Sequence, residues 1–520
     1  MKKRPQGIVV GGGIGGLVAA ILLASRGYPI TLLEQNEALG GKLQPMQLGA
    51  YAFDFGPSTI TMPWVFESVF REAGQPLDPE LSFRKLEVNS RNGFADGTTV
   101  DLSADPLRME EQLCSFRAED RQGFLRYLME VERIYRTAEE QFFSRSFSVW
   151  QDFVSPRLGA AFLSVHPFLG MDAFHQRYFR DPRLLAMMNR YATYVGSSPY
   201  ETPATLSMIA YLELVRGVYY IPGGNYRLVE ALERLARRTG VEIRTGVRTE
   251  AILERDGRIR GVQAGGETLQ ADFVVSNADY FTTRGLITDG GSAARESAGG
   301  RRTSSRFEGA SLSSSGFLCL FGLKGRVPGL HHHNLYYPEN YGSEFADIFR
   351  DRQWPALPAL YVCASSATEP ERAADGTGTN LYVLINVPPE VPVYRRTRDG
   401  QPAGGTAEDA RREREHTYRS LIVRRLAEAW GLPARELEAR IEAEAVFGPD
   451  YIASRTGAYG GALYGSASHG WRETFFRPAP ADRRIRGLYY AGGSTHPGGG
   501  TPMVTLSGIN AARLIAARHR

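Results

Sequence analysis

The feature that most restricts how this chain can fold is the run GIVVGGGIGGLVAA at residues 7–20. Residues 8–10 favour a buried strand, Gly11, Gly13 and Gly16 fit the pattern G-x-G-x-x-G, and residues 17–25 favour a helix. Glycines at these positions allow a tight turn, so that backbone N–H groups and the helix dipole can approach a pyrophosphate. The sequence therefore predicts a Rossmann-like dinucleotide site, with Ile14 and Gly15 in its loop.

An acidic residue follows at the spacing such a site uses. The second apolar run, YPITLLE, ends in Glu34, which is 18 residues after Gly16. An acid there binds the ribose hydroxyls and disfavours a 2′-phosphate. The alternative interpretation, a glycine-rich turn that holds no ligand, leaves this acid without a role.

The residues after Glu34 help to decide between NAD and FAD. Gly40, Gly41 and Lys42 form a second glycine turn with a cation, and Gly56 and Pro57 form a turn after an aromatic strand. An NAD dehydrogenase does not need this arrangement. We therefore expect a flavoprotein.

A third glycine-rich segment, LYYAGGSTHPGGGTPMVTLSG, occupies residues 488–508. Residues 488–491 favour a buried strand, and the residues from Val504 onward favour a helix. Thr501 suits a helix cap and Pro502 suits the first helical position. This segment is expected to direct a helix N-terminus at an electron-rich ligand.

In this order the motifs, together with LLEQNEALGGK, FDFGPSTITMP and YYIPGGNYRLVEALERLA, resemble the bacterial-type carotenoid (phytoene) desaturase family of FAD flavoproteins. The resemblance runs from about residue 6 to residue 516 and places the chain in the wider amine-oxidase-like superfamily. It is nearest the diapophytoene desaturases and the branch that oxidises terminal methyl groups of diaponeurosporene or diapolycopene. The stretch LYGSASHGWRETFFRP is also similar to desaturases of hydroxylated acyclic carotenoids.

The resemblance implies an α/β fold with a discontinuous FAD-binding domain at 1–83, 215–283 and 475–520. A mixed sheet-plus-helices domain, substrate-binding and membrane-facing, is expected at 84–214 and 284–474. Within the first domain, helix and strand signals alternate from about residue 215 to 283, with an amphipathic helix at 226–239.

The resemblance also implies the cofactor contacts. Val247 would meet the adenine side of FAD through its backbone, with plain strand packing as the alternative, and Asn277 would border the cofactor. The isoalloxazine would be lined by Gly492, Gly493, Pro502, Met503 and Val504. His496 is a weak candidate proton acceptor, with a structural role in the loop as the alternative.

An acyclic polyene offers no acidic proton, so the hard step is removal of a hydride, which FAD can accept. The expected activity is FAD-dependent oxidation of a linear carotenoid, most directly at terminal methyl groups. Insertion of double bonds into phytoene, diapophytoene or a hydroxycarotenoid is the alternative. A flavin amine oxidase, of another class, would want an aromatic cage and often a Lys near the flavin, and this chain is poor in Lys.

Charge and hydropathy restrict the partners. The net charge is +4 and Arg residues alternate with acids, so nucleic-acid binding is not expected. No apolar window spans a membrane, and three Cys without C-x-x-C spacing favour a reducing, cytoplasmic location. The aromatic segments at 124–143 and 142–163 are either a core helix pair or a peripheral membrane contact. The oligomeric state stays open, a homo-oligomer included.

Two further patterns carry no expected chemistry. The HHH run at 331–333 has no Asp, Glu or Cys at metal-site spacing, so a solvent-edge cluster and no metal are expected. The polar stretches at 288–305 and 395–413 are interpreted as loops.

Overall fold

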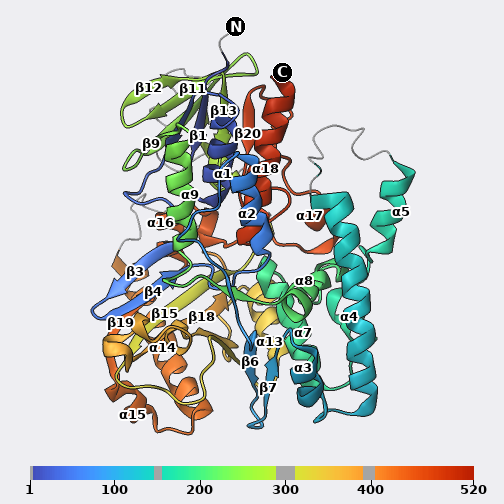
Figure 1. Cartoon of the computed structure of the whole chain (residues 1–520). Coiled ribbons are helices and arrows are strands. Elements are labelled where there is room, and N and C mark those ends of the chain that lie inside the picture. Colours follow the sequence, from blue (N-terminus) through green and yellow to red (C-terminus); the bar gives the residue numbers. More distant parts are fainter. Residues whose placement is uncertain (1–3, 144, 146–154, 289–310, 391–404, 520) are drawn as a thin grey trace.

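The computed structural model describes residues 4–143, 145, 155–288, 311–390 and 405–519. Two sheets organise the molecule, one near the two termini at the top of Figure 1 and a larger one below it. The first of the two loop-like stretches, at 288–305, lies outside the described residues except for its first residue.

The upper sheet is parallel and has five strands in the order β20-β13-β1-β2-β9. Its three central strands are short, continuous apolar runs, as expected for parallel strands covered on both faces. The five strands come from three distant parts of the chain, so the sheet closes only when these parts meet. The strands are β1 (Gly7–Val10), β2 (Ile30–Leu33), β9 (Glu242–Arg244), β13 (Phe273–Ser276) and β20 (Leu488–Tyr490).

Helices cover this sheet. The first, α1 (Ile14–Ala24), begins three residues earlier than the predicted start at residue 17, because Gly15 and Gly16 already belong to its first turn. Helix α9 (Arg227–Arg238) agrees with the expected amphipathic helix. The others beside it are α2 (Pro63–Glu72), α10 (Tyr280–Leu286) and α18 (Thr501–Arg518).

Helices α1 and α18 touch through glycine. A Cβ added to Gly508 would lie 2.4 Å from the carbonyl oxygen of Gly15 and 2.9 Å from Cβ of Val18. Both helices are rich in small and aliphatic residues, which permits this approach. The C-terminal helix therefore lies directly on the helix that follows the first glycine loop (Figure 1).

Smaller strands lie outside these two sheets, and the hairpin formed by residues 44–55 packs against the larger, lower sheet (Figure 1). A four-stranded sheet, in the order β12-β11-β10-β14, and the hairpin β3-β4 lie outside the parallel sheet, and β5 pairs with β8. Their bounds are β3 (Gln44–Leu48), β4 (Tyr51–Phe55), β5 (Arg84–Lys85), β8 (Tyr219–Tyr220), β10 (Thr249–Arg255), β11 (Arg258–Ala264), β12 (Glu267–Gln270) and β14 (Ile287–Thr288).

The lower sheet has seven strands in the order β19-β15-β18-β17-β16-β6-β7, all antiparallel except the β16-β6 pair. Strand β15, which lies between β19 and β18, is buried at all nine positions. The strands are β6 (Ser90–Gly93), β7 (Thr99–Leu102), β15 (Ser315–Leu323), β16 (His333–Tyr336), β17 (Leu360–Cys363), β18 (Thr379–Val387) and β19 (Ile441–Phe447).

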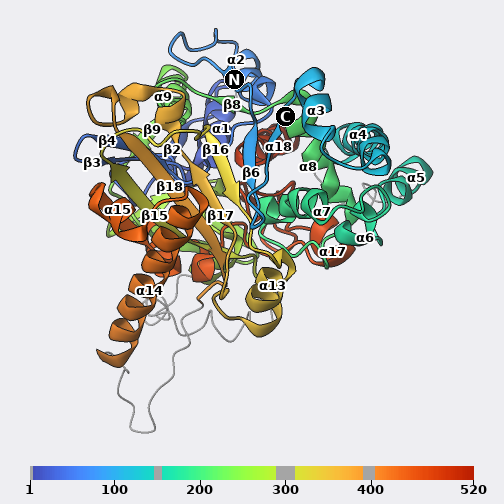
Figure 2. The ribbon, with the colours of Figure 1, turned by 90° about the horizontal axis from the view of Figure 1, so that it is seen from below.

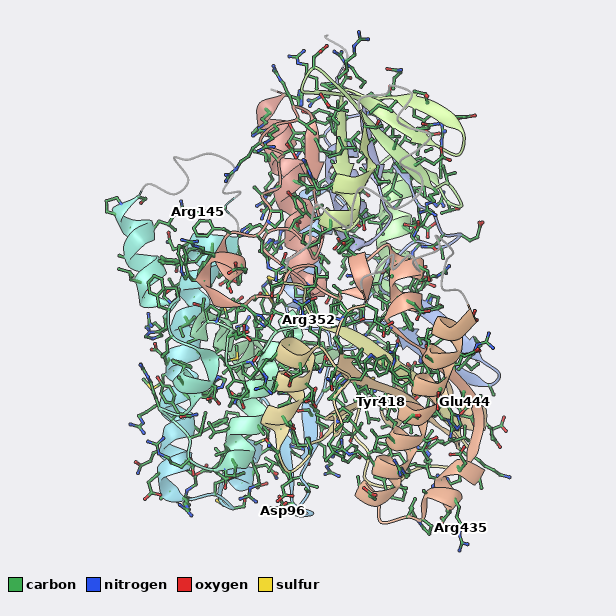
Figure 3. All side chains as sticks on the ribbon, turned by 180° about the vertical axis from the view of Figure 1, so that it is seen from behind. Asp96, Arg145, Arg352, Tyr418, Arg435 and Glu444 are labelled. Carbon is green, nitrogen blue, oxygen red and sulfur yellow. The ribbon has the colours of Figure 1, made fainter. Side chains whose placement is uncertain are left out.

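Helix α14 (Gly405–Ala429) packs on this sheet together with α15 (Ala434–Ala439), as Figure 2 shows from below. Tyr418 of α14, labelled in Figure 3, packs edge-on against Trp354 at 4.8 Å, and the next residue, Arg419, pairs through Nη2 with Glu444 Oε2 of β19 at 2.5 Å. The prediction of a loop at 395–413 is therefore wrong from Gly405 onward. Its charged residues form the solvent face of a helix whose later turns bury Ile422 and Leu426.

A group of helices completes the molecule beside the lower sheet (Figure 2). The predicted helix at 124–143 is confirmed as α4 (Ala118–Ala138) and the π-helical turn Glu139–Phe143, and its apolar face joins a large core cluster. Among the described residues, no helix is both long and apolar enough to cross a membrane. The remaining helices are α3 (Pro106–Leu113), α5 (Pro156–Ser164), α6 (Met171–His175), α7 (Pro182–Asn189), α8 (Met208–Tyr211), α13 (Tyr341–Phe345), α16 (Pro449–Thr456) and α17 (Gly470–Phe475).

Candidate functional site

The two N-terminal glycine turns lie against each other. The N–H of Gly40 donates to the carbonyl oxygen of Gly12 at 2.9 Å, and Gly13 and Gly40 form a parallel bridge. Gly11 has φ +96° and Gly40 has φ +114°, a region that side chains with a Cβ rarely adopt. Together the turns make a surface of exposed backbone at the carboxyl edge of the parallel sheet, which is where nucleotides bind in such folds.

Glu34 follows β2 at this edge. Its Oε2 accepts from the N–H of Gly12 at 2.7 Å, and its Oε1 accepts from the N–H and the side-chain amide of Asn36 at 2.9 and 2.7 Å. The carboxylate is thereby fixed beside the first glycine loop, with lone pairs left for further donors. The N–H of Val247 donates to the Glu34 carbonyl oxygen at 2.8 Å, so a backbone contact between Val247 and adenine cannot use that N–H.

Asn277 ties the two ends of the chain together. Its N–H donates to the Val10 carbonyl oxygen at 2.7 Å, and its Nδ2 donates to the Ala491 carbonyl oxygen at 3.1 Å. A Cβ on Gly492 would lie 2.6 Å from this Nδ2, and a Cβ on Gly13 would lie 2.6 Å from Asn277 Oδ1. Glycine is therefore required on both sides of the amide.

Helix α18 begins one residue earlier than expected. Its N-cap is Gly500, with φ +95°, and Thr501 is the first helical residue, so the prediction that Thr501 is the cap is wrong. A positive φ suits glycine at this turn, and the Thr501 hydroxyl caps no N–H. Its Oγ1 is instead buried without a hydrogen-bond partner among the described residues.

These parts surround a single cavity of about 690 Å³. It reaches from the glycine turns, past the start of α18, to the core of the helical part and the lower sheet. Nearly all of the predicted cofactor residues line it. They are Gly11, Gly13, Ile14, Gly15, Glu34, Gly40, Gly41, Lys42, Gly56, Pro57, Val247, Asn277, Gly492, Gly493, Pro502, Met503 and Val504.

Gly16 and His496 are set back from the cavity lining. A Cβ on Gly16 would lie 2.2 Å from the Gly11 carbonyl oxygen, so this glycine serves the packing of helix against loop. His496 is buried, and its Nε2 lies 3.1 Å from the Phe142 carbonyl oxygen. Burial lowers the pKa of His496 to about 4. This geometry supports a structural role for His496.

Lys42 lies in the cavity wall between the glycine turns and the loop that follows α16. Its Nζ donates to the Leu463 carbonyl oxygen at 2.5 Å. Burial lowers the pKa of Lys42, and the nearby Asp279 carboxylate acts in the opposite direction. Burial likewise raises the pKa of Asp279, so each group makes the charge of the other less costly.

The far arm of the cavity is largely apolar, with a buried ion pair in its wall. Arg190 Nη2 lies 3.2 Å from Glu213 Oε2, and the hydroxyl of Tyr194 donates to the same carboxylate. Both charged side chains are at most 5% exposed. Desolvation of both charges offsets most of the attraction, so a buried pair of this kind contributes little net stability. The apolar lining of the arm comes from Leu206, Met208, Ile209, Leu212, Leu335 and Leu360.

A flavin dinucleotide fits these residues. The glycine turns offer backbone N–H groups to a pyrophosphate, and Glu34 offers acceptors to a ribose. The Thr501 hydroxyl, which has no hydrogen-bond partner among the described residues, is available at the start of the helix to a polar atom of the ligand. The N-terminus of α18 would stabilise negative charge on the ring.

Sequence reasoning missed part of the lining. Asp279 directly follows the motif VVSNA, and its position as a polar residue at the end of a strand is a signal from which it could have been predicted. Arg190 and Tyr194 lie in a short 3-10 turn, Arg190–Val195, whose pattern carries no recognisable signal. Their meeting with Glu213 depends on how two helical turns pack.

The expected solvent-edge histidine cluster is also corrected. His332 and His333 are 4% and 2% exposed, because they enter the lower sheet at the start of β16. Cys363, thirty residues further along the chain, lies beside them.

Comparisons with known proteins agree with this geometry. Residues 14–284 match the family described as flavin containing amine oxidoreductase. The chain is 35% identical to hydroxyneurosporene desaturase of Rubrivivax gelatinosus, covering 98% of this chain and 93% of that protein. It is 32% identical to 4,4'-diapolycopene oxygenase of Methylomonas sp, covering 96% of each. It is also 32% identical to 4,4'-diaponeurosporene oxygenase of Staphylococcus aureus, covering 98% of each.

Solved structures share the fold. Putrescine oxidase bound to putrescine superposes with a TM-score of 0.62 at 12% identity, covering 99% of both chains. Cyclohexylamine oxidase from Brevibacterium oxydans gives 0.56 at 14% identity, again over 99% of both. At this identity the likeness concerns the fold alone.

Proposed function

Because this chain belongs to the flavin containing amine oxidoreductases, and among them to the FAD-dependent carotenoid desaturase family, we propose that it oxidises an acyclic carotenoid. Bound FAD supplies the hydride acceptor. The observation that carries the proposal is the single cavity that joins the glycine turns to a long apolar arm.

The chain's own residues position the substrate and exclude water. The leucine and methionine side chains of the arm match a hydrocarbon that carries few polar groups, and their contacts are non-directional. A long polyene can therefore slide to place one carbon beside the ring while the arm holds the remainder. His496 takes no part in this proposal, because it lies behind the lining.

We place the reaction at the terminal methyl groups. Arg190 lines the otherwise apolar arm, and its Nε is buried without a hydrogen-bond partner among the described residues, so this side chain provides N–H donors to which a substrate oxidised at its end can present oxygen atoms. Relatives named 4,4'-diapolycopene oxygenase and 4,4'-diaponeurosporene oxygenase support this branch.

Desaturation of a hydroxylated acyclic carotenoid is the second candidate. The same donors suit a hydroxyl group, and hydroxyneurosporene desaturase is 35% identical to this chain. A flavin amine oxidase is less well supported, since the two amine oxidases of known structure described above are only 12% and 14% identical to this chain.

We further propose that the protein binds a membrane surface peripherally. An apolar surface patch, defined here as Leu163, Phe168 and Phe476, is 63%, 66% and 47% exposed. Phe168 contacts Trp471 of α17 at 5.8 Å, and Thr474 of the same helix lines the cavity. The helix would thus join a lipid-facing surface to the substrate arm.

The decisive experiment is the product mass after the FAD-loaded protein, with liposomes under air, receives linear carotenoids of thirty and forty carbons, with and without a hydroxyl group. Gain of oxygen as an aldehyde is expected. Loss of hydrogen pairs from a hydroxylated substrate alone would favour the second candidate. Oxidation of amines, with every polyene recovered unchanged, would contradict the proposal.

A matched pair of variants locates the reaction in the arm. Leu206→Arg places a charge among apolar side chains and is expected to abolish turnover while the flavin spectrum is retained. Leu357→Arg changes a leucine that is 56% exposed and is expected to keep full turnover. Equal activity of the two variants would exclude the arm as the substrate site.

A further inference from the structure

Three buried side chains with soft donor atoms meet between β16 and β17. His333 and Cys363 are directly opposite in the antiparallel register, and His332 precedes them at the start of β16. One donor atom from each of the three lies within 4.8 Å of the others. All three residues are less than 10% exposed.

The two imidazoles are held by their Nδ1 atoms. His332 Nδ1 lies 2.8 Å from Thr368 Oγ1, and His333 Nδ1 lies 2.8 Å from the hydroxyl of Tyr361. A hydrogen bond on the other ring nitrogen is how metal-binding histidines are usually oriented. It leaves Nε2 as the donor atom, and Nε2 of His333 is buried without a partner among the described residues.

The protonation states suit a neutral donor set. Burial lowers the pKa of His332 to about 3 and keeps His333 well below its ordinary pKa, so both rings are neutral at neutral pH. Burial raises the pKa of the Cys363 thiol to about 12. Metal binding would therefore release one proton from the thiol, and the thiolate would form the metal bond.

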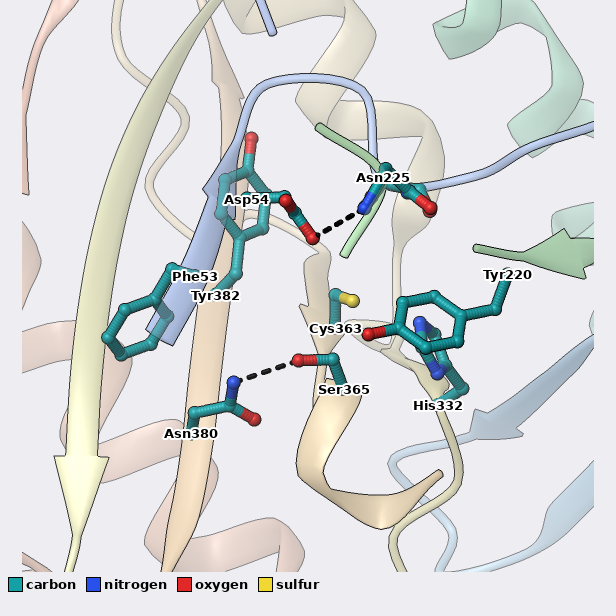
Figure 4. Close-up of a pocket in the computed structure, with 10 residues that line it drawn as sticks. Phe53, Asp54, Tyr220, Asn225, His332, Cys363, Ser365, Asn380 and Tyr382 are labelled. Atoms are coloured by element: carbon teal, nitrogen blue, oxygen red, sulfur yellow. Dashed lines mark hydrogen bonds between the residues drawn. The ribbon is translucent and has the colours of Figure 1, made fainter. Parts of the chain in front are cut away.

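A small cavity of about 10 Å³ adjoins the cluster, with His332 and Cys363 in its lining. Figure 4 shows the sulfur of Cys363 and the ring of His332 beside Tyr220. This space holds one water molecule or one ion. The carboxylate of Asp54, also in the lining, is already engaged by Arg372 Nη2 at 3.1 Å and by the N–H of Asn225 at 3.0 Å.

We propose that His332, His333 and Cys363 bind one thiophilic d¹⁰ metal ion, Cu⁺ or Zn²⁺. Nitrogen and sulfur donors in this combination select such ions. A three-coordinate ion with bonds of about 2.0–2.3 Å sets its donors about 3.5–3.7 Å apart. Because all the donor atoms lie within 4.8 Å of one another, no pair would need to close by more than about 1 Å.

Charge favours Cu⁺ over Zn²⁺. One thiolate neutralises a monovalent ion, so the Cu⁺ site carries no net charge in an interior that penalises charge. Zn²⁺ would keep one positive charge close to Arg372 and would need a fourth ligand, for which the small cavity offers space for one water.

The ion would cross-link β16 to β17. His333 is linked through the Tyr361 hydroxyl to Ser58 Oγ, 2.5 Å beyond it, and Tyr361 and Ser58 both line the large cavity. Metal occupancy would thus fix one wall of the substrate arm from behind.

The test uses the untagged, FAD-loaded full chain, reduced and under anaerobic conditions. The protein is dialysed against chelator-buffered Cu⁺ or, separately, Zn²⁺, and metal per chain is measured. We expect one equivalent to be retained, with X-ray absorption showing nitrogen and sulfur neighbours.

Two cysteine variants separate this cluster from adventitious binding. Cys363→Ser is expected to weaken retention by at least about tenfold, whereas Cys114→Ser, which alters an exposed thiol, should retain the full equivalent. If Cys363→Ser fails to fold, His332→Asn replaces it. Retention of neither metal by the natural sequence, or equal retention by Cys363→Ser, would overturn the proposal and leave a bound water as the occupant.

Discussion

At the scale of single residues, some polar atoms in the cavity wall already have hydrogen-bond partners, whereas others have none among the described residues. Glu34 has both carboxylate oxygens engaged by backbone and amide groups. The Thr501 hydroxyl is buried with no partner among the described residues, which costs free energy unless a ligand supplies one. Glu34 therefore holds the first glycine loop in place, whereas the Thr501 hydroxyl is available for a hydrogen bond to a bound ligand.

The substitution Thr501→Val tests whether the Thr501 hydroxyl contacts the cofactor. Valine keeps the shape and removes the hydroxyl, so FAD affinity should fall about fivefold, which corresponds to about 1 kcal/mol. The flavin-free protein should be as stable as the original or more stable, because a buried unpaired hydroxyl is gone. Flavin fluorescence titration and thermal unfolding measure the two effects, and Thr501→Ser serves as the control. An unchanged dissociation constant would show that the hydroxyl does not contact the cofactor.

At the scale of elements, the contact of α1 with α18 sets the position of the C-terminal loop. Gly508 meets the Gly15 carbonyl oxygen, which is backbone and cannot rotate away. Any side chain at this position must push the two helices apart, together with the loop that carries Gly492.

Gly508→Ala should therefore destabilise the protein by about 1–3 kcal/mol and lower its flavin content. Gly159→Ala in α5 is the matched control, because an added Cβ there meets no described atom within 4 Å and alanine is the better helix former. Denaturant unfolding and flavin absorbance give both readings. Similar behaviour of the two variants would refute the close-packing argument.

The elements also show what the sequence could predict. The glycine turns, Glu34 and the strand before Asn277 were recognisable because their function depends on local spacing. The prediction of a solvent-edge cluster is wrong for His332 and His333, because the pairing of β16 with β17 buries them. That pairing also brings Cys363, which is distant in the sequence, next to them. The start of α18 was displaced by one residue, because Gly500 takes the cap conformation that Thr501 was expected to take.

At the scale of the whole molecule, two segments far apart in the sequence bring apolar side chains to one exposed patch. Leu163 belongs to α5, Phe168 follows it, and Phe476 follows α17. Phe475 of α17 packs on Phe162 at 4.9 Å, which fixes the segments relative to one another. The patch is therefore formed by segments that pack on each other behind it.

Replacing Leu163, Phe168 and Phe476 together by serine should weaken binding to liposomes by at least about tenfold, because each side chain buried in lipid contributes about 1.5–3 kcal/mol. Flavin content should not change. Leu357→Ser, at an exposed leucine outside the patch, is the control, and flotation with vesicles provides the measurement. Undiminished flotation of the triple variant would remove this patch from the membrane contact.

The pairing of β1 with β13, and of β13 with β20, affects the order in which the protein can fold during its synthesis. The ribosome makes the first glycine loop before it makes Asn277, and it makes both before the loop at Gly492, which Asn277 joins to the first loop. Until then the nascent chain exposes the edge of β13 and the face of α1 that α18 later covers. We therefore expect stable cofactor binding only after β20 has been made, because the Gly492 loop and the start of α18 line the same cavity as the first glycine loop.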